Sequence, residues 1–446
     1  MARLFGTDGV RGVANTELTP LLAFHLGRAG AAVLTKETAP KILVGTDTRI
    51  SCDMLEASLT AGMCSVGASV ISVGVIPSPA IAYLVRKYKC DAGVMISASH
   101  NPFYDNGIKF FNGKGYKLSD EIEDQIEALM HNESKIPVPT AEKIGFRILG
   151  EQAKADYEQF LFETMQGLMF DFNVGIDCAN GATSVIAPSL LKRLGADIHV
   201  INASPNGLNI NVNCGSTHME SLCALVKNEK LAAGLAFDGD GDRCLMVDET
   251  GKVIDGDQMM SICANFMKEH GELNKDTVVV TVMSNLGFML MGKKRGINIE
   301  VTNVGDRYVL EHMLEKGFVL GGENSGHIIF LNHNTTGDGI LSALQVLRIM
   351  KLTGKKLSEL NTYMEVMPQI LINAKVSSEK KHAYLDDEII KQKIESIESR
   401  FAGNGRVLIR PSGTEPKVRV MIEGENLDEI TTEAKMLAEL IEDRLK

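Results

Sequence analysis

Short apolar runs alternate with segments of helical periodicity along most of the chain. Residues 41–77 read as the apolar run KILVG, a helix-like stretch that ends at Val66, and a second apolar run, SVISVGV. This order predicts a strand, a helix and a second, parallel strand. It returns at 172–205 and at 276–305. Because helices alternate with strands in all three segments, we expect an α/β fold of largely parallel sheets with helices on both faces.

The pattern changes in residues 367–446. A strand-like run, QILINAKV, is followed by a charged helical segment, two strand-like runs around a loop, and a final helix. In that helix, apolar residues at helical spacing predict one buried face, formed by Leu427, Ile430, Ala434, Leu437 and Ile441. The last part of the chain is therefore expected to be a smaller α+β domain.

The composition is that of a folded protein with several domains. At about 150 residues per domain, the length of 446 residues predicts about three domains. The apolar fraction of 44% and the charged fraction of 23% exclude a disordered chain. A net charge of −11 repels nucleic acids and anionic membranes, so we expect neither as a partner. Any anionic ligand then needs a local basic pocket.

The cysteines and the start of the chain favour a cytoplasmic location. The eight cysteines are scattered without a C-x-x-C pair, which is typical of reduced thiols. The first residues lack a signal-peptide pattern, and no apolar run approaches the roughly 18 residues of a membrane span.

Residues 94–109, VMISASHNPFYDNGIK, place a hydroxyl directly after a predicted strand. Pro102 prevents the strand from continuing, so Ser99 and His100 are expected on a sharp loop. Lys109 adds a basic group of the kind that phosphoryl transfer requires. Taken alone, S-x-S-H-N-P is explained better by a Ser/Asn-rich turn.

The segment DGDGDR at 238–243 predicts a metal site. Asp238, Asp240 and Asp242 alternate with glycines that let the backbone fold tightly around one centre, and hard oxygen ligands favour Mg²⁺ or Ca²⁺. An EF-hand is the competing interpretation, because Glu249 falls at its twelfth position. Its sixth position is Arg243 in place of glycine, so Mg²⁺ is the better prediction.

Two further loops carry ligand-binding chemistry. GGENSGH at 321–327 offers side chains that can bond several hydroxyls of a polar ligand, although alone it could equally be a turn. RPSGTEPKVR at 410–419 combines arginines, hydroxyls and backbone amides in a loop stiffened by two prolines. This combination predicts a phosphate-binding loop, with a basic hairpin as the weaker alternative.

Taken together and in this order, SASHNP, DGDGDR, GGENSGH and RPSGTEP closely resemble the loops of the α-D-phosphohexomutase superfamily, and the resemblance extends over the whole chain. It implies three similar α/β domains with mixed, largely parallel sheets, and a smaller C-terminal α+β domain, around a central cleft. The implied domains are 1–150, 151–253, 254–366 and 367–446.

The resemblance also implies a role for each matching residue. Ser99 would carry a phosphoryl group and join Asp238, Asp240 and Asp242 around Mg²⁺. The implied catalytic groups around the reacting phosphoryl are Arg11, His100, Lys109 and Arg243. The implied substrate-binding residues are Glu323, Asn324, Ser325 and His327 for the sugar, and Arg410, Ser412, Gly413, Thr414 and Arg419 for the non-reacting phosphate.

The sugar loop reads GENSG where phosphoglucomutases and phosphomannomutases typically read GEMSG. The chain is therefore most similar to the bacterial members that interconvert glucosamine 6-phosphate and glucosamine 1-phosphate for UDP-N-acetylglucosamine synthesis. That reaction passes through glucosamine 1,6-bisphosphate, and this compound or a similar phosphoryl donor primes the serine. The resemblance also implies a homodimer. A phosphoglucomutase or phosphomannomutase, a Mg²⁺-dependent sugar phosphatase and a non-catalytic sugar-phosphate sensor remain alternatives.

Overall fold

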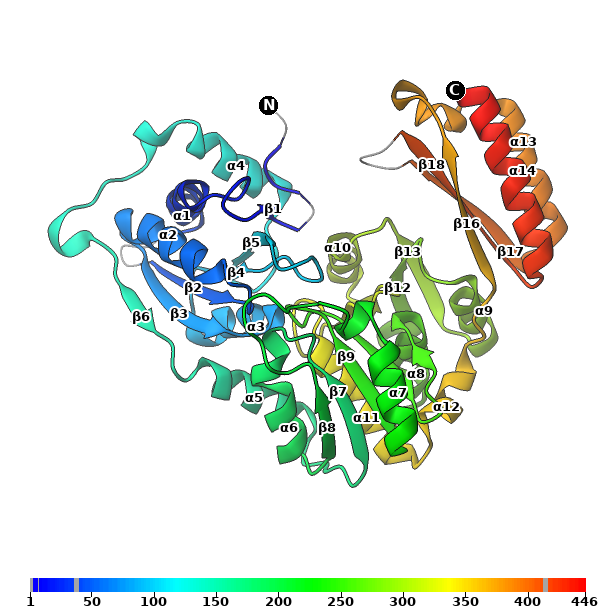
Figure 1. Cartoon of the computed structure of the whole chain (residues 1–446), viewed down its shortest axis with the longest axis horizontal. Coiled ribbons are helices and arrows are strands. Elements are labelled where there is room, and N and C mark those ends of the chain that lie inside the picture. The colour runs from blue at the N-terminus through cyan, green and yellow to red at the C-terminus, as the bar shows by residue number, and fades with distance from the viewer. Residues whose placement is uncertain (1–2, 7, 36–39, 412–415) are drawn as a thin grey trace. The chain divides into compact units, whose positions relative to one another are not determined.

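The computed structural model describes residues 3–6, 8–35, 40–411 and 416–446, and its four β-sheets follow one another along the chain (Figure 1). The chain forms two compact units. The larger unit contains Met1–Met283 and Ile297–Thr362, with the first three sheets. The smaller unit contains Ser284–Gly296 and Tyr363–Lys446, with the fourth sheet.

The first sheet has six strands in the order β1-β5-β4-β2-β3-β6. Strands β4, β2, β3 and β6 are parallel, β5 is antiparallel to β4, and the edge strand β1 is antiparallel to β5. The strands are β1 (Val10–Val13), β2 (Lys41–Thr46), β3 (Ser69–Val75), β4 (Ala92–Ile96), β5 (Asp105–Asn112) and β6 (Arg147–Leu149). The accompanying helices are α1 (Pro20–Leu34), α2 (Cys52–Ser65), α3 (Ser78–Tyr88) and α4 (Asp120–Met130).

The second sheet has the order β11-β10-β9-β7-β8. Strands β9, β7 and β8 are parallel, β10 is antiparallel to β9, and the edge strand β11 is antiparallel to β10. Its strands are β7 (Asn173–Asp177), β8 (Asp197–Ile201), β9 (Ala233–Phe237), β10 (Cys244–Asp248) and β11 (Val253–Ile254). Its helices are α5 (Ala153–Thr164), α6 (Ala187–Arg193) and α7 (Glu220–Glu229). Helix α6 begins at Ala187, because the proline that follows suits only a first helical turn.

The third sheet has the order β13-β12-β14-β15, with β15 antiparallel to the others. Its strands are β12 (Thr277–Thr281), β13 (Asn298–Thr302), β14 (Leu320–Gly322) and β15 (Ile328–Phe330). The helices of this part are α8 (Gly256–Glu269), α10 (Asp306–Lys316), α11 (Gly339–Thr353) and α12 (Leu357–Leu360), while α9 (Leu286–Arg295) belongs to the smaller unit. All three predicted strand-helix-strand segments are confirmed, each with its two strands parallel.

The smaller unit carries an antiparallel sheet in the order β16-β18-β17. The strands are β16 (Gln369–Lys375), β17 (Gly405–Pro411) and β18 (Lys417–Gly424), and helices α13 (Glu388–Phe401) and α14 (Leu427–Leu445) pack beside them (Figure 1). The predicted apolar face of α14 is confirmed at four positions, but Leu427 is 53% exposed. It is the first residue of the helix, directly after the Asn426 cap, and it falls outside the buried face.

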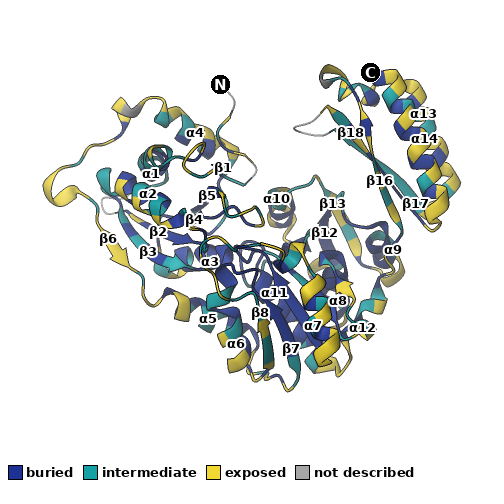
Figure 2. Cartoon of the chain, viewed as in Figure 1, coloured by how far each residue is buried: buried dark blue, intermediate teal, exposed yellow. Residues whose placement is uncertain are grey.

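Buried central strands form the cores, as the dark blue strands in Figure 2 show. All five residues of β4, β9 and β12 are buried, which accounts for their uninterrupted apolar sequences. The eight cysteines are free thiols. Within the described residues, none of the helices has both the length and the apolar character needed to cross a membrane.

Glu423 joins the sheet of the smaller unit to the segment before α9. Its side chain is fully buried, and it accepts hydrogen bonds from Arg406 Nε at 2.5 Å and Asn285 Nδ2 at 3.2 Å. Arg406 also donates to the backbone carbonyl of Ser284. This ion pair therefore holds two distant segments of the chain in one unit.

We predict that Glu423→Ala destabilises the smaller unit by about 3 to 5 kcal/mol, because it leaves the Arg406 charge partly buried without its partner. Hydrogen exchange of the β17 and β18 amides measures the loss locally. Glu425→Ala is the matched control, since Glu425 is exposed and bonds only the side chain of Asn404. Equal protection in both variants would contradict the prediction.

Candidate active site

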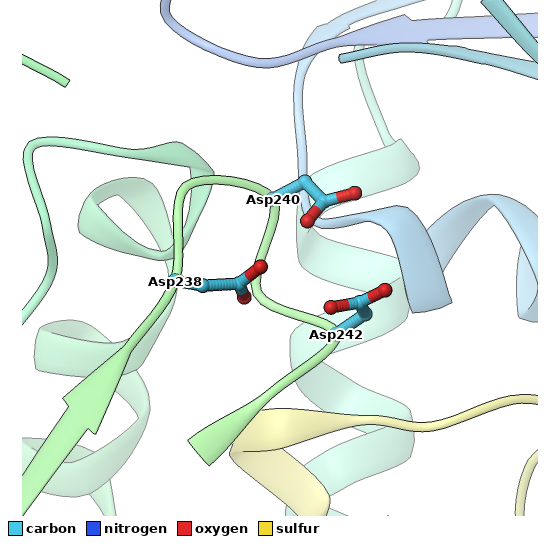
Figure 3. A group of neighbouring side chains, drawn as sticks. All are labelled: Asp238, Asp240 and Asp242. Carbon is cyan, nitrogen blue, oxygen red and sulfur yellow. The ribbon is translucent and has the colours of Figure 1, made fainter. Parts of the chain in front are cut away.

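Three buried carboxylates lie together on the loop between β9 and β10. Asp238, Asp240 and Asp242 each offer an oxygen, and these oxygens lie within 4.8 Å of one another (Figure 3). Oδ1 of Asp240 and Oδ1 of Asp242 are buried and have no hydrogen-bond partner among the described residues. Such oxygens suit a hard cation, so the predicted metal loop has the donor set to hold one.

The loop is not an EF-hand. Residues Cys244–Asp248 form strand β10, which pairs antiparallel with β9. Glu249, at the twelfth EF-hand position, bonds Ser358 Oγ at 2.5 Å. The second half of an EF-hand loop is therefore replaced by sheet.

Ser99 lies on the predicted sharp loop after β4, directly against the carboxylates. Its hydroxyl donates to Asp238 Oδ2 at 2.5 Å, and its Oγ lies 3.4 Å from His100 Nδ1. Ser99 has a φ of 51°, which is uncommon for a residue other than glycine and costs energy unless neighbouring contacts enforce it. A Cβ added to Gly239 would lie 2.5 Å from the Ser99 carbonyl, so only glycine permits the metal loop to approach this closely.

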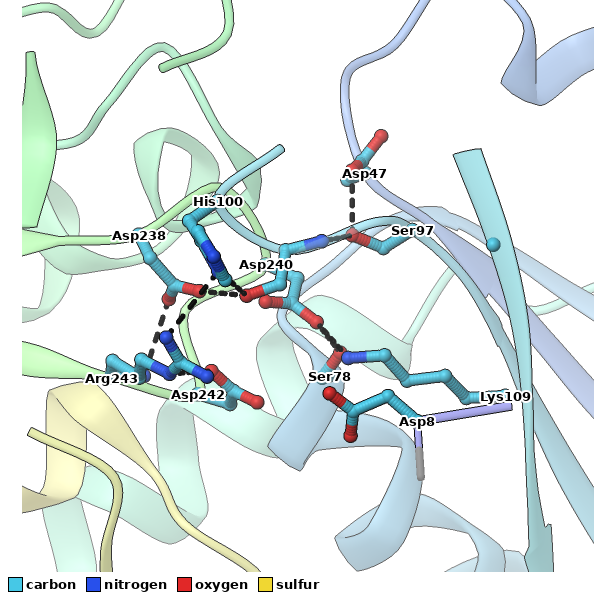
Figure 4. Close-up of polar contacts among 12 residues, drawn as sticks. Asp8, Asp47, Ser78, Ser97, His100, Lys109, Asp238, Asp240, Asp242 and Arg243 are labelled. Atoms are coloured by element: carbon cyan, nitrogen blue, oxygen red, sulfur yellow. Dashed lines mark hydrogen bonds and ion pairs between the residues drawn. The ribbon is translucent and has the colours of Figure 1, made fainter. Parts of the chain in front are cut away.

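Cations and other donors surround the carboxylates. Lys109, on β5, is buried and donates to Asp240 Oδ2 at 2.9 Å, and Ser78 donates to the same oxygen at 2.5 Å (Figure 4). Arg243 donates its backbone N–H to Asp238 Oδ1 at 3.2 Å and its Nη1 to His100 Nδ1 at 3.3 Å. Arg11, on β1, pairs instead with Asp8 at 2.9 Å.

The charges shift the pKa values of these groups. Burial, together with the charges of Asp242 and Asp240, raises the pKa of Asp238 well above its usual range. Burial alone would lower the pKa of Lys109, but the carboxylates of Asp240 and Asp8 raise it, so the ammonium stays charged. Burial, followed by the charges of Arg243 and Arg11, lowers the pKa of His100. Its imidazole is therefore neutral at pH 7.

The tautomer of His100 follows from its neighbour. An arginine can only donate, so the contact from Arg243 requires a lone pair on His100 Nδ1. The same nitrogen faces the hydroxyl of Ser99. A neutral acceptor therefore lies beside the candidate nucleophile.

The sugar loop at 321–327 connects β14 to β15 in the same unit. Glu323 Oε1 accepts the Gly305 N–H at 3.1 Å, and Ser325 Oγ is buried without a hydrogen-bond partner in the described part of the chain. Asn324 is exposed. His327 is buried against the metal loop, with Nδ1 3.5 Å from Asp242 Oδ2.

In the smaller unit, Arg410 and Arg419 occupy directly opposite positions on β17 and β18. Like charges in such a cross-strand pair repel each other, so the position favours an anionic ligand. The other predicted phosphate-loop residues, Ser412, Gly413 and Thr414, lie outside the described residues.

Comparison with known proteins shows which family has this set of loops. The four domain models of the phosphoglucomutase/phosphomannomutase family match the chain in order. The α/β/α domain I matches residues 2–137, domain II residues 154–251, domain III residues 255–367, and the C-terminal domain residues 371–440. The chain belongs to this phosphohexomutase family.

Close relatives match over the full length. A protein of Ruminiclostridium cellulolyticum named phosphoglucosamine mutase is 61% identical, and one of Acetivibrio thermocellus with the same name is 58% identical, each with 100% of both chains covered. A solved structure of a phosphoglucomutase/phosphomannomutase family protein from Burkholderia thailandensis has a TM-score of 0.81 at 19% identity, with 98% of each chain covered. That of Aspergillus fumigatus N-acetylphosphoglucosamine mutase, in complex with GlcNAc-6P and magnesium, has a TM-score of 0.71 at 20% identity and covers 99% of this chain and 96% of that one.

Arg49 is a residue of this candidate site that the sequence analysis missed. Its side chain is fully buried and donates to Asp47 at 2.8 Å and to the backbone carbonyls of Ser99 and Asn101 at 2.9 Å each. Asn211 donates to the same two carbonyls. A signal was present, because Arg49 follows β2, whose carboxyl end lies at the same sheet edge as that of β4.

A second missed group links the first and third sheets. Lys117 Nζ donates to Asp8 at 2.7 Å and to Asp306 at 2.6 Å, and His327 Nε2 lies 3.3 Å from Asp306 Oδ2. The carboxylates of Asp306 and Asp242 on either side outweigh the effect of burial and raise the pKa of His327. Residues about 200 positions apart meet here, and no local pattern indicated this.

We predict that Arg49→Lys lowers mutase kcat about 100-fold with little change in KM, because one ammonium cannot hold both carbonyls of the Ser99 loop and misplacement of a reacting group is costly. Steady-state kinetics measure this, with thermal unfolding to establish that the variant is folded. Arg147→Lys is the matched control, since Arg147 is exposed on β6. A wild-type kcat in Arg49→Lys would show that this arginine does not position the loop.

Proposed function

We propose that the chain interconverts glucosamine 6-phosphate and glucosamine 1-phosphate, with Ser99 as the phosphoryl carrier. The observation that carries the proposal is the 2.5 Å contact of Ser99 Oγ with Asp238, inside a ring of buried carboxylates and cations. The name and the 61% identity of the R. cellulolyticum relative support the choice of sugar.

The chemistry consists of two phosphoryl transfers. In the first, the bond between Ser99 Oγ and phosphorus breaks and a bond from phosphorus to the free O1 or O6 of the sugar phosphate forms. That sugar hydroxyl loses its proton, and Ser99 Oγ gains one as it leaves. This yields glucosamine 1,6-bisphosphate. In the second, Ser99 loses its proton and takes back the phosphoryl group from the other end of the sugar, whose oxygen regains a proton. Glucosamine 1,6-bisphosphate or a similar donor primes the serine.

We assign proton acceptance from Ser99 to His100, because Asp238, which accepts the Ser99 hydroxyl, would be engaged by the bound metal. His100 Nδ1 carries a lone pair, lies 3.4 Å from Ser99 Oγ, and belongs to an imidazole whose pKa is lowered by burial and by Arg243. Lys109 stays protonated and supplies positive charge for the equatorial oxygens of the phosphoryl group, together with Arg11 and Arg243.

Mg²⁺ fits the carboxylate loop. Asp240 and Asp242 each have an oxygen that accepts no hydrogen bond from the described residues, and three buried carboxylates repel one another. A hard divalent cation would relieve both. Asp238, Asp240, Asp242 and the Ser99 side chain would hold it, and the magnesium in the A. fumigatus complex supports the choice of ion. The ion supplies Lewis-acid stabilisation of the phosphoryl oxygens.

The remaining predicted residues complete the proposal. Glu323 and the unpartnered Ser325 hydroxyl bind sugar hydroxyls, and the opposed Arg410 and Arg419 bind the non-reacting phosphate. Ser412, Gly413 and Thr414 belong to the same proposed phosphate loop. His327 holds the metal loop from behind through Asp242. The cytoplasmic location, the central cleft and the homodimer stay predictions.

We predict that Ser99→Ala lowers mutase kcat to below about one thousandth of wild type, because the covalent route is lost. Peptide mass spectrometry of wild-type enzyme is expected to find a phosphoryl group on Ser99 and none in the variant. Ser97→Ala is the control: it retains the carrier hydroxyl while it removes two supporting hydrogen bonds, one from the Ser99 backbone N–H to Ser97 Oγ and one from Ser97 Oγ to Asp47. Near wild-type turnover by Ser99→Ala would refute the carrier role.

We predict that Asp240→Asn raises the Mg²⁺ concentration needed for half-maximal activity at least about tenfold, because the site loses one of few anionic ligands. Calorimetric titration with Mg²⁺ provides a readout independent of turnover. Glu249→Gln is the matched control: it removes the twelfth carboxylate of the EF-hand interpretation and should leave Mg²⁺ binding unchanged. The opposite pattern in the two variants would restore that interpretation.

We predict a kcat/KM for glucosamine 1-phosphate about ten- to a hundredfold above that for glucose 1-phosphate or mannose 1-phosphate, as expected for one hydrogen bond to a charged 2-amino group. Asn324→Met, which restores the residue of the related GEMSG loops, should reduce the preference. Assays of all three substrates side by side test this. Equal or greater efficiency with glucose 1-phosphate would remove the glucosamine assignment while leaving the phosphohexomutase chemistry intact.

A further inference from the structure

A cavity of about 400 Å³ lies in the larger unit, away from the carboxylate loop. One wall is formed by Cys263, Phe266 and Met267 of α8, and the facing wall by Gln345, Arg348 and Ile349 of α11. Each set follows the helical spacing i, i+3, i+4, so each helix presents one face to the cavity. The volume falls in the range of small-molecule sites.

The walls carry hydrogen-bond donors without an acceptor. Gln345 is 9% exposed, and its buried Nε2 has no hydrogen-bond partner among the described residues. The Arg348 guanidinium lies 5.6 Å from the centre of the Phe266 ring, and within the described part of the chain it forms no ion pair. Buried donors are almost always satisfied in folded proteins, so the buried Gln345 amide indicates an acceptor supplied from outside the chain. Arg348 is only half-buried and contributes positive charge beside that amide.

The rest of the lining defines the body of the ligand. Phe266, Cys263, Ile349 and Phe330 are buried apolar residues. Glu272 brings the opposite charge to the lining, but it is exposed, so water and salt screen it. Thr164, Gln166, Asn332 and His333 add polar groups to the lining, and His270 stacks on the Phe266 ring with 3.9 Å between the ring centroids. The lining therefore favours a small body with one apolar side that ends in an anionic acceptor.

We propose that this cavity binds a small aromatic anion, whose carboxylate or phosphate accepts hydrogen bonds from Gln345 and Arg348 while its ring packs against Phe266. Both anionic groups offer the same acceptor chemistry to these donors.

The same two helices contact the active-site loops at their other ends. At the start of α8, the Gly256 N–H donates to the Asn324 carbonyl of the sugar loop at 3.0 Å. At the start of α11, the Gly339 N–H donates to the Gly241 carbonyl of the carboxylate loop at 3.0 Å. A Cβ added to Gly256 would lie 2.2 Å from the Glu323 carbonyl, so the start of α8 is tightly packed against the sugar loop.

A ligand between the helices therefore acts on both loops. If it changes the spacing of α8 and α11, the sugar loop and the carboxylate loop must shift with the helix starts, because tightly packed elements move together. We infer that an occupied cavity alters mutase turnover. This effect on turnover rests on the proposed function, whereas binding in the cavity does not.

Saturation-transfer NMR on the full-length protein tests binding, with phenylacetate and phenyl phosphate as probes and uncharged phenylacetamide as the matched neutral compound. We expect saturable binding of at least one anion and at least about tenfold weaker binding of phenylacetamide. Arg348→Met and Gln345→Leu each remove a donor at similar volume and should weaken anion binding about tenfold or more. Lys351→Met is the control, because Lys351 is a cation of the same helix that pairs with Asp171 outside the cavity.

The outcomes separate cleanly. Three results would each contradict the proposed site. Neither anion shows saturable binding, phenylacetamide binds as tightly as the anions, or anion binding is retained in both Arg348→Met and Gln345→Leu. Thermal unfolding establishes whether each variant is folded. If Arg348→Met is unfolded, anion binding by Gln345→Leu alone tests the site. If the bound anion changes the turnover of the wild type but not that of the variants, the result supports coupling between the cavity and the active-site loops. Unchanged turnover at saturation would overturn the coupling and leave the binding result and the proposed function standing.

Discussion

The repulsion among three buried carboxylates is the constraint on which the rest of the site depends. Asp238, Asp240 and Asp242 are nearly inaccessible to water, and charges taken out of water are costly unless they are paired. The ammonium of Lys109 pairs with Asp240, and backbone and side-chain donors bond the carboxylates. Two carboxylate oxygens accept no hydrogen bond from the described residues and can bind a cation. Each of these partners comes from a different part of the larger unit.

The strained backbone of Ser99 follows from the same constraint. A hydroxyl at the end of β4 reaches Asp238 only if the loop turns sharply, and the positive φ of Ser99 is the result. Arg49 and Asn211 hold the loop by its carbonyls, so that the strain does not relax. A preorganised nucleophile of this kind loses less entropy on reaching the transition state than one on a mobile loop. The rigid clamp therefore favours in-line transfer at a fixed position.

A chain of polar contacts extends from the carboxylates to the sugar loop. Asp242 faces His327, His327 faces Asp306, and Asp306 shares Lys117 with Asp8. The neighbouring Gly305 bonds Glu323 of the sugar loop. Contacts within one compact unit thus link the charges at the metal loop to the side chains of the sugar loop. Helices α8 and α11 provide a second link between these two loops.

The sequence alone determined the repeated strand-helix-strand segments, the smaller α+β part and the loops that carry Ser99 and the three aspartates. These features are local: apolar periodicity defines the elements, and glycine, proline and polar clusters mark the loops between them. Only the tertiary structure decided which distant side chains complete the site. Arg49, Asn211 and Lys117 act across separations of roughly 50 to 190 residues. The position of Arg49 after a strand was a local signal, whereas the neighbourhoods of Asn211 and Lys117 read as ordinary polar surface. The exposure of Leu427 has the same origin, since helical spacing identifies a face but only the packed sheet sets where burial begins.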